Sequence, residues 1–213
     1  TSLAAHGFHR DDVTDVLLTH LHFDHCGGSI LREGDRLLPA FKNAVYWSNE
    51  AHWNWATKPN DREKASFLKE NILPIQESGQ LQFISQPSVK GRAEGESAPG
   101  PLLHTTFSDN ISLLFADGHT RGMMLPQISY KGRTIVYMAD LLPSAGHIPL
   151  PYVMAYDMFP LTTLQEKGSF LNWAEAKDCV LFFEHDAQTE CCDLQRTDKG
   201  VREKNRFSLK DLL

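Results

Sequence analysis

The stretch Val16-Leu17-Leu18-Thr19-His20-Leu21-His22-Phe23-Asp24-His25-Cys26-Gly27-Gly28 determines how the rest of this sequence is interpreted. It opens with a short apolar run, which is typical of a buried strand. The six residues from 20 to 25 follow this run, and four of them can bind a metal ion: His20, His22, Asp24 and His25. Burying that many ionisable groups without partners costs on the order of several kcal/mol each, so they are either solvated or bound to a cation. The stretch therefore predicts a metal site at the end of a strand.

The spacing His20-x-His22-x-Asp24-His25, followed by Cys26-Gly27-Gly28, resembles the signature of the metallo-β-lactamase superfamily. Later segments resemble the remaining motifs of that family: Asp117-Gly118-His119-Thr120, Met138-Ala139-Asp140 and Phe183-Glu184-His185-Asp186. Each motif lies at the end of a predicted strand, where a side chain can leave the sheet and point into a shared cleft. The resemblance covers nearly the whole chain and is strong only at these motifs.

The resemblance implies a site for two divalent metal ions. It assigns the first metal to His20, His22 and His119. It assigns the second metal to Asp24, His25 and His185, and a bridging position to Asp140. Neutral imidazoles and carboxylates suit zinc, while manganese, iron or cobalt could occupy the same cage. Two such metals lower the pKa of a shared water towards neutrality, which makes hydroxide the expected nucleophile and gives Asp24 and Asp140 a catalytic as well as a ligating role.

Residues that contact the substrate are expected close to these motifs. His147 lies in the loop that follows Asp140, where the family's substrate loops gather, and the same loop carries further aromatic residues. The expected substrate contacts are Phe23, His147, Tyr152 and Tyr156. Trp53 and Trp55 could also line an apolar pocket, but core packing explains them equally well.

The fold class implied by the resemblance is α+β, the αββα four-layer sandwich of this superfamily, formed as a single domain over residues 1–213. Apolar runs predict strands at 16–18, 44–48, 111–116, 123–129, 134–139 and 179–183. Helices are expected over Arg62–Ile72, ended by Pro74, and over Thr163–Lys177, opened by a capping box at its first residues. The stretch from Gln86 to Pro101 has the composition of a loop.

The segment before the first motif is short, because only residues 1–19 precede His20. Members of the family usually carry two or more strands there, so we expect the fold to lack its N-terminal strands. A preceding segment or a second copy of the chain, as in a homodimer, would supply them. Without such cover these residues are not expected to form a stable monomer.

Composition limits the choice of partners. The chain has 21 Lys and Arg against 27 Asp and Glu, a net charge of −6, so it has no excess of positive charge with which to hold a nucleic acid. No run of 18 apolar residues occurs, so no membrane span is expected. The four cysteines favour reduced thiols over a disulfide scaffold. Localisation stays open, with a slight preference for the cytoplasm.

The function expected is a dinuclear hydrolase that acts on a small lactone or ester, because the long segment between His25 and His119 is similar to that of the lactonase and organophosphate-hydrolase branch. One alternative is a glyoxalase-II-like thioesterase, whose glutathione carboxylates could be held by Lys199, Arg202, Lys204 and Arg206. A less favoured alternative is an iron-dependent redox enzyme, since oxygen reductases of this fold usually have Glu at the position of His22. The last is a binding module without catalysis.

Overall fold

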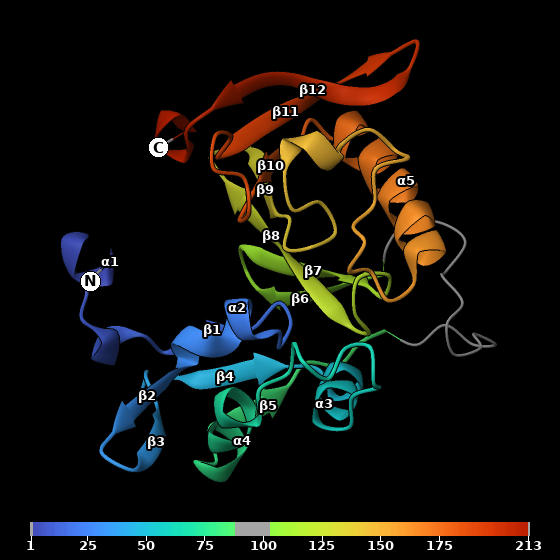
Figure 1. The fold of residues 1–213 in the computed structure, drawn as a ribbon. Coiled ribbons are helices and arrows are strands. Elements are labelled where there is room, and N and C mark those ends of the chain that lie inside the picture. Colours follow the sequence, from blue (N-terminus) through green and yellow to red (C-terminus); the bar gives the residue numbers. More distant parts are fainter. Residues whose placement is uncertain (1, 88–102, 213) are drawn as a thin grey trace. The chain divides into compact units, whose positions relative to one another are not determined.

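The computed structural model describes residues 2–87 and 103–212. The chain divides into two compact units, Thr1–Ser85 and Gln86–Leu213 (Figure 1). Each unit combines helices with a sheet, as the α+β expectation requires. The single domain over residues 1–213 stays a prediction. Among the described residues, no helix combines the length and the apolar character needed to cross a membrane.

The first unit is built on a parallel sheet with the order β1-β4-β5, formed by Asp15–Leu17, Val45–Ser48 and Leu81–Phe83. The strands expected at 16–18 and 44–48 are confirmed to within one residue. The unit also contains the hairpin β2–β3 (Ile30–Glu33 and Arg36–Pro39) and the helices α1 (Ser2–Ala5), α2 (Phe23–Cys26), α3 (Glu50–Thr57) and α4 (Lys69–Glu77). Its core is formed mainly by Leu21, Tyr46, Trp53, Phe67, Ile72 and Ile75.

The helix expected over Arg62–Ile72 is wrong in its bounds, because α4 begins only at Lys69. The stretch before it forms turns, in which Asn60 Oδ1 accepts hydrogen bonds from the backbone N–H groups of Arg62 and Glu63 at 2.9 and 3.1 Å. Pro74 does not end the helix and lies inside it. Its ring is buried with Ile72 and Ile75, so packing offsets the one backbone hydrogen bond that proline removes.

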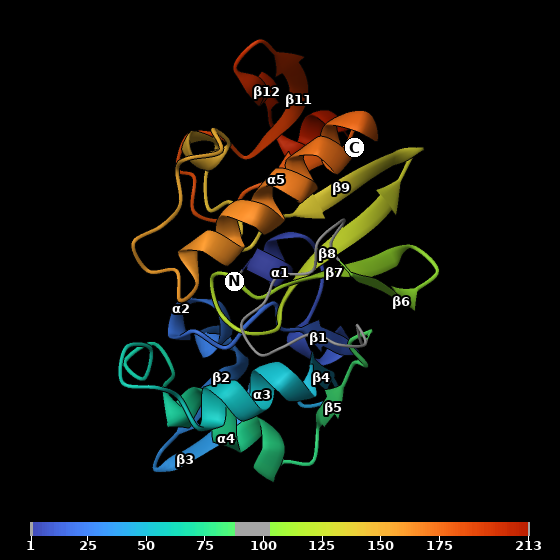
Figure 2. The same cartoon turned by 90° about the vertical axis from the view of Figure 1, so that its right-hand side faces the viewer.

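The second unit is built on a seven-stranded sheet with the order β12-β11-β10-β9-β8-β7-β6. Its strands are β6 (His104–Ser108), β7 (Ile111–Ala116), β8 (Met123–Tyr130), β9 (Arg133–Tyr137), β10 (Val180–Phe182), β11 (Cys191–Thr197) and β12 (Gly200–Phe207). All neighbours are antiparallel except β9 and β10, which need a crossover because they run in parallel. Helix α5 (Pro160–Ala176) supplies that crossover and lies along the sheet (Figure 2).

The strands predicted for the second unit are confirmed to within two residues. Lys131 and Gly132 join β8 to β9 as a hairpin turn, both with positive φ, as that turn requires. The core beneath α5 contains Leu125, Val136, Met138, Leu142, Phe170 and Leu181. The unit also carries two short 3-10 turns, η3 (Ala145–His147) and η4 (Leu209–Leu212).

The capping box expected at the start of α5 is absent, because the helix begins three residues earlier, at Pro160. Proline suits the first helical position, where its missing N–H is not needed. Thr163 is therefore inside the helix, and Glu166 does not cap it. Instead Glu166 accepts hydrogen bonds from the backbone N–H groups of Asp117 and Gly118 at 2.8 and 3.0 Å. This carboxylate holds the turn that leads to His119.

The close approach of Gly118 to α5 gives a test of this packing. A Cβ atom at Gly118 would lie only 2.5 Å from the Cα of Thr163, which is backbone and cannot rotate away. We expect Gly118→Ala to lower the free energy of unfolding by about 2 kcal/mol or more, measured by urea denaturation with circular dichroism.

The matched control lies in α5 itself. A Cβ atom at Gly168 would meet only Leu150 Cδ1, at 3.5 Å, so Gly168→Ala should raise the free energy of unfolding by about 0.5–1 kcal/mol through its better helix propensity. If Gly118→Ala were as stable as the parent protein, the close packing of the turn on α5 would be contradicted.

Candidate metal centre

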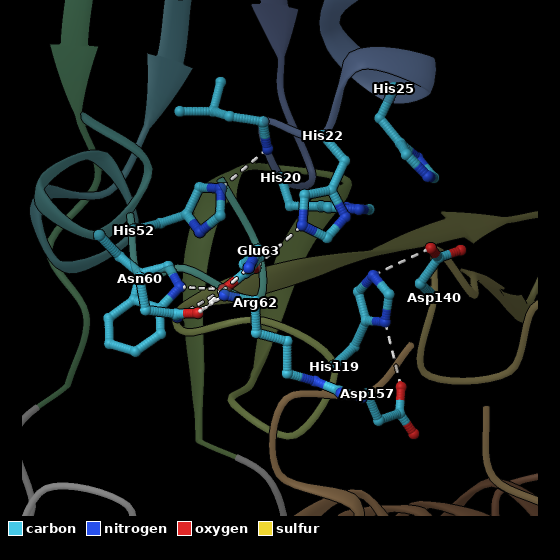
Figure 3. A network of polar contacts seen from close by, with 12 residues as sticks. His20, His22, His25, His52, Asn60, Arg62, Glu63, His119, Asp140 and Asp157 are labelled. Carbon is cyan, nitrogen blue, oxygen red and sulfur yellow. Dashed lines mark hydrogen bonds and ion pairs between the residues drawn. The ribbon is translucent and has the colours of Figure 1, made fainter. Parts of the chain in front are cut away.

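The first motif begins in the turn between β1 and α2, where His20 and His22 lie, and ends inside α2, which carries Asp24 and His25 (Figure 3). His20 and His22 are buried, with exposed fractions of 0% and 8%. The ring centroid of His20 lies 4.6 Å from that of His22 and 3.9 Å from that of His25. Asp24 is adjacent, with Oδ2 at 3.7 Å from His25 Nε2. The first unit thus gathers all four side chains that its sequence predicts as ligands.

The backbone of this turn is fixed by side chains from elsewhere in the first unit. His52 Nε2 accepts a hydrogen bond from Leu21 N at 2.8 Å, and His52 N itself donates to Asn49 Oδ1 at 2.9 Å. Cys26 Sγ donates to Leu21 O at 3.3 Å. Burial raises the pKa of Cys26 to about 12, so its thiol stays protonated at neutral pH and serves packing.

A buried carboxylate lies behind His22. Glu63 Oε1 is 2.9 Å from His22 Nε2, and Trp55 Nε1 donates to Glu63 Oε2 at 2.6 Å. Trp53, in contrast, packs in the core of the first unit. Both tryptophans therefore pack on the core, Trp53 fully buried and Trp55 partly buried, and Trp55 also holds a polar partner through its indole N–H.

In the second unit, Asp140 lies between two histidines. Its Oδ2 is 3.1 Å from His119 Nε2, and its Oδ1 is 3.3 Å from His185 Nε2. Asp140 thus presents one oxygen to each histidine, and it could serve as a carboxylate ligand beside either of them. Ala139, just before Asp140, has a φ of 42°, a left-handed conformation that is unfavourable for alanine. Such strain at the residue before a candidate ligand is typical of a functional site.

Strand direction explains how these residues come together. β7 and β9 are both antiparallel to β8, and β10 is parallel to β9, so β7, β9 and β10 point the same way. Their carboxyl ends therefore share one edge of the sheet. His119, Asp140 and His185 each follow their strand by three residues, after Ala116, Tyr137 and Phe182.

The loops that carry Asp140 and His185 are tied together by Asp186. Its Oδ2 accepts from Ala145 N at 3.0 Å, and its Oδ1 accepts from Gln188 N and Thr189 N, both at 2.9 Å. Burial alone would raise the pKa of Asp186, but these backbone N–H groups hold it below its usual value. Asp186 is therefore a charged anchor for the edge of the sheet.

The second carboxylate beside His119 is Asp157, whose Oδ1 lies 3.1 Å from His119 Nδ1. Burial opposes the charged imidazole, but the hydrogen bonds to Asp140 and Asp157 outweigh it and raise the pKa of His119 to about 9. A metal ion that binds Nε2 would have to displace a proton.

The donors in both units fit a divalent transition metal. They are imidazole nitrogens and carboxylate oxygens, the set that zinc and its neighbours in the first row prefer. Every residue that the sequence selected as a ligand belongs to a cluster of histidines and carboxylates that could hold a metal ion. His20, His22, Asp24 and His25 come from the first unit, and His119, Asp140 and His185 from the second. Their individual roles, including the catalytic roles of Asp24 and Asp140, stay predictions.

Three of the four residues expected to contact the substrate are well exposed, and the fourth, His147, is partly buried. Phe23 opens α2 and is 49% exposed, while Tyr152 and Tyr156 are 60% and 81% exposed on the loop after η3. His147, in η3, has its Nδ1 at 2.9 Å from Ser144 Oγ, and burial lowers its pKa. The roles of these four residues also stay predictions.

Lys167 of α5 fixes the loop that carries the two tyrosines. The side chain is fully buried, with an exposed fraction of 0%, and Nζ donates to Pro149 O at 2.9 Å and to Tyr152 O at 2.6 Å. Burial lowers the pKa of Lys167 to about 8. With a pKa of about 8 the side chain is still mostly an ammonium at neutral pH, and two of its three N–H donors are used by these carbonyl groups.

Several of these contacts were missed by sequence reasoning. Glu63, Glu166 and Lys167 lie in charged or helical stretches that are typical of solvated surface, and Asp157 is a lone aspartate in the aromatic loop before α5. Each acts on a residue far away along the chain, 41 residues for Glu63 and His22, and 49 for Glu166 and Asp117. No local spacing marks them.

The pKa of Lys167 can be measured directly. In protein labelled with ¹³C at lysine Cε, one signal should titrate near pH 8, and it should disappear in Lys167→Met. The unfolded lysine keeps a pKa near 10.5, so between pH 8 and 10.5 the unfolded state binds more protons and the free energy of unfolding rises with pH. Lys167→Met should remove this rise. A Lys167 signal titrating near 10.5 would argue against the burial of the amine.

Comparison with known proteins places the chain among enzymes that bind metals. A family model described as "Metallo-beta-lactamase superfamily" matches residues 1–185. The chain resembles a probable metal-dependent hydrolase from Staphylococcus aureus, with 23% identity and a TM-score of 0.79 over 99% of this chain and 68% of that one. It also resembles AidC, a dizinc quorum-quenching lactonase solved with the product N-hexnoyl-L-homoserine, with 19% identity and a TM-score of 0.77 over 98% and 69%.

A further similar structure is the hydrolase AbOPH, with 19% identity and a TM-score of 0.72 over 97% of this chain and 69% of that chain. No match was found among curated proteins. The identities are low, so these structures establish the fold alone. They confirm the fold that the sequence motifs predict.

Proposed function

Because the chain belongs to the metallo-β-lactamase superfamily of metal-dependent hydrolases, we propose that it is a dinuclear hydrolase that acts on a small lactone or ester. The observation that carries this proposal is Asp140, whose two oxygens face the Nε2 atoms of two different histidines at 3.1 and 3.3 Å. We propose that His20, His22, Asp24 and His25 supply the remaining ligands, and that the metal is zinc.

The chemistry supplied by two bound metal ions is the activation of a water molecule and the polarisation of the bond that it attacks. The residues of the chain prepare the site for that chemistry. Asp157 and Asp140 hold the His119 ring from both of its nitrogens. Glu166 and Asp186 hold the loops on which the donors lie, so that little reorganisation is needed when the metals bind.

The substrate proposed is small, neutral and apolar. The loop over residues 148–156 contains no lysine or arginine, and it exposes Leu150, Tyr152 and Tyr156 by 42%, 60% and 81%. Such a loop suits the acyl chain of an ester or lactone. The net charge of −6 disfavours a substrate with several phosphates. The lactonase title of AidC, a protein of similar fold, supports the same class.

The thioesterase alternative is less favoured. Of the basic residues considered for glutathione, Arg206 is engaged by Glu203, with Nη2 at 2.7 and 2.9 Å from the two carboxylate oxygens. Arg202 donates to the carbonyl of Val201 at 2.7 Å. The redox alternative is less favoured because a histidine, His22, stands where oxygen reductases of this fold usually have a glutamate.

The metal content tests the core of the proposal. Elemental analysis of protein purified without chelators should give close to two transition-metal ions per chain. Asp140→Asn should lower both the metal content and kcat/KM, the latter by at least about 100-fold, because the bridging carboxylate is lost.

The matched control is Asp178→Asn, since this aspartate is 81% exposed and pairs with Arg133 at the surface of the same unit. It should leave metal content and activity unchanged. Near-normal turnover by Asp140→Asn, or a metal content of zero in the parent protein, would contradict the dinuclear mechanism.

The substrate class is tested by steady-state kinetics on the metal-replete protein. Acyl-homoserine lactones or aryl esters should give a higher kcat/KM than phosphodiesters or S-lactoylglutathione, because the loop over residues 148–156 offers apolar contacts and no cation. Tyr152→Ala should raise KM for substrates with long acyl chains more than for those with short ones. A preference for S-lactoylglutathione would favour the thioesterase alternative instead.

A further inference from the structure

Glu63 is a buried carboxylate with partners on both of its oxygens (Figure 3). Its exposed fraction is 3%. Oε1 lies 2.9 Å from His22 Nε2, and Oε2 accepts a hydrogen bond from Trp55 Nε1 at 2.6 Å. The amide of Asn60 approaches Oε2 at 3.5 Å, and Asn60 Oδ1 also accepts the backbone N–H of Glu63 at 3.1 Å. The carboxylate is therefore held in one orientation.

This orientation determines which nitrogen of His22 carries the hydrogen. A carboxylate only accepts, so the nitrogen that faces Oε1 must be the donor. His22 Nε2 therefore carries the hydrogen, and Nδ1 keeps its lone pair. In the neutral imidazole only that second nitrogen can bind a metal ion.

The buried carboxylate of Glu63 needs hydrogen-bond donors from the surrounding fold. An ionised carboxylate loses a large part of its hydration when it is buried, and hydrogen bonds must replace that hydration. Here the donors come from three separate places: the ring of His22, the indole of Trp55 in α3 and the amide of Asn60. A carboxylate that served packing alone would not need to face the imidazole.

We infer that Glu63 is the positioning residue of His22: it fixes the tautomer and the orientation of the ring so that Nδ1 is ready for a metal ion. The inference rests on the proposed function in one respect, namely that His22 is a metal ligand. Trp55 acts through Glu63 by holding its second oxygen. The segment between the histidine motifs thus contributes to the metal site through a carboxylate rather than through an apolar wall.

The test is zinc affinity, measured on the whole chain by competition with a chromophoric chelator. In Glu63→Gln the amide NH₂ can face His22 Nε2 and its oxygen can face Trp55, which stabilises the tautomer that has its hydrogen on Nδ1. The variant should bind zinc about 10–100-fold more weakly than the parent protein. The absorption bands of the cobalt-loaded protein should also change, because a ligand is altered.

Two variants guard against a general structural effect. Trp55→Phe keeps the ring and removes only the N–H donor, so it should weaken zinc binding in the same direction and by less. Asp61→Asn alters a fully exposed carboxylate, 99% accessible and paired with Lys64, two residues from Glu63 in the same turn. It should leave zinc affinity unchanged.

A double-mutant cycle decides whether Glu63 acts through His22. Once His22→Ala has removed the imidazole, adding Glu63→Gln should cause no further loss of zinc affinity. An equal loss in both backgrounds would overturn the inference, and so would unchanged affinity in Glu63→Gln. If Glu63→Gln does not fold, the same cycle with Trp55→Phe applies the same criterion. Failure of the parent protein to bind zinc would overturn the proposed function itself, a separate result.

Discussion

The common direction of β7, β9 and β10 is the constraint on which the second unit's site depends. Because the three strands point the same way, the residues that follow them must emerge at one edge of the sheet. β10 can run parallel to β9 only if the chain crosses over between them, and α5 provides this crossover. The same helix then carries Glu166 and Lys167, which reach the turn before His119 and the loop after Asp140. The crossover through α5 thus gives β10 the same direction as β9, and it also supplies the side chains that hold the loops at this edge of the sheet.

Buried polar side chains in both units follow one physical rule. A buried histidine needs a partner for each nitrogen, and a buried carboxylate needs several donors. The second unit satisfies this rule with Asp157 beside His119, and the first with Glu63 beside His22. Asp157 faces Nδ1 of His119, and Glu63 faces Nε2 of His22. In each case the nitrogen proposed to bind a metal ion is the other one. The same arrangement, a buried carboxylate that faces one nitrogen of a histidine, therefore occurs in two units that fold around different sheets.

The sequence predicts the parts of this protein that depend on local patterns. The apolar runs predict β7, β8, β9 and β10 of the second unit, and the residues just after such runs include the histidines and aspartates of the site, because strand ends and motif spacing are properties of short stretches. The more polar strands β6, β11 and β12 were not predicted. The bounds predicted for helix α4 and for the start of α5 were wrong. Asn60, Pro74 and Pro160 act there through turn geometry and packing, which hydrophobic spacing does not encode. Glu63 and Glu166 could not be predicted, because each meets a partner that is distant along the chain.

The anchoring of the loop over residues 148–156 bears on the choice of substrate. A lysine is the usual source of positive charge in a pocket for an anionic ligand, yet Lys167 is turned inward to two backbone carbonyls, and burial lowers its pKa to about 8. The amine therefore serves as a hydrogen-bond donor that positions the loop, and it is not presented to a ligand. What the loop exposes is Leu150, Tyr152 and Tyr156. A surface with apolar contacts and no exposed cation discriminates against anionic substrates through their desolvation cost, which is why a neutral ester or lactone fits this loop better than a phosphodiester or a glutathione conjugate.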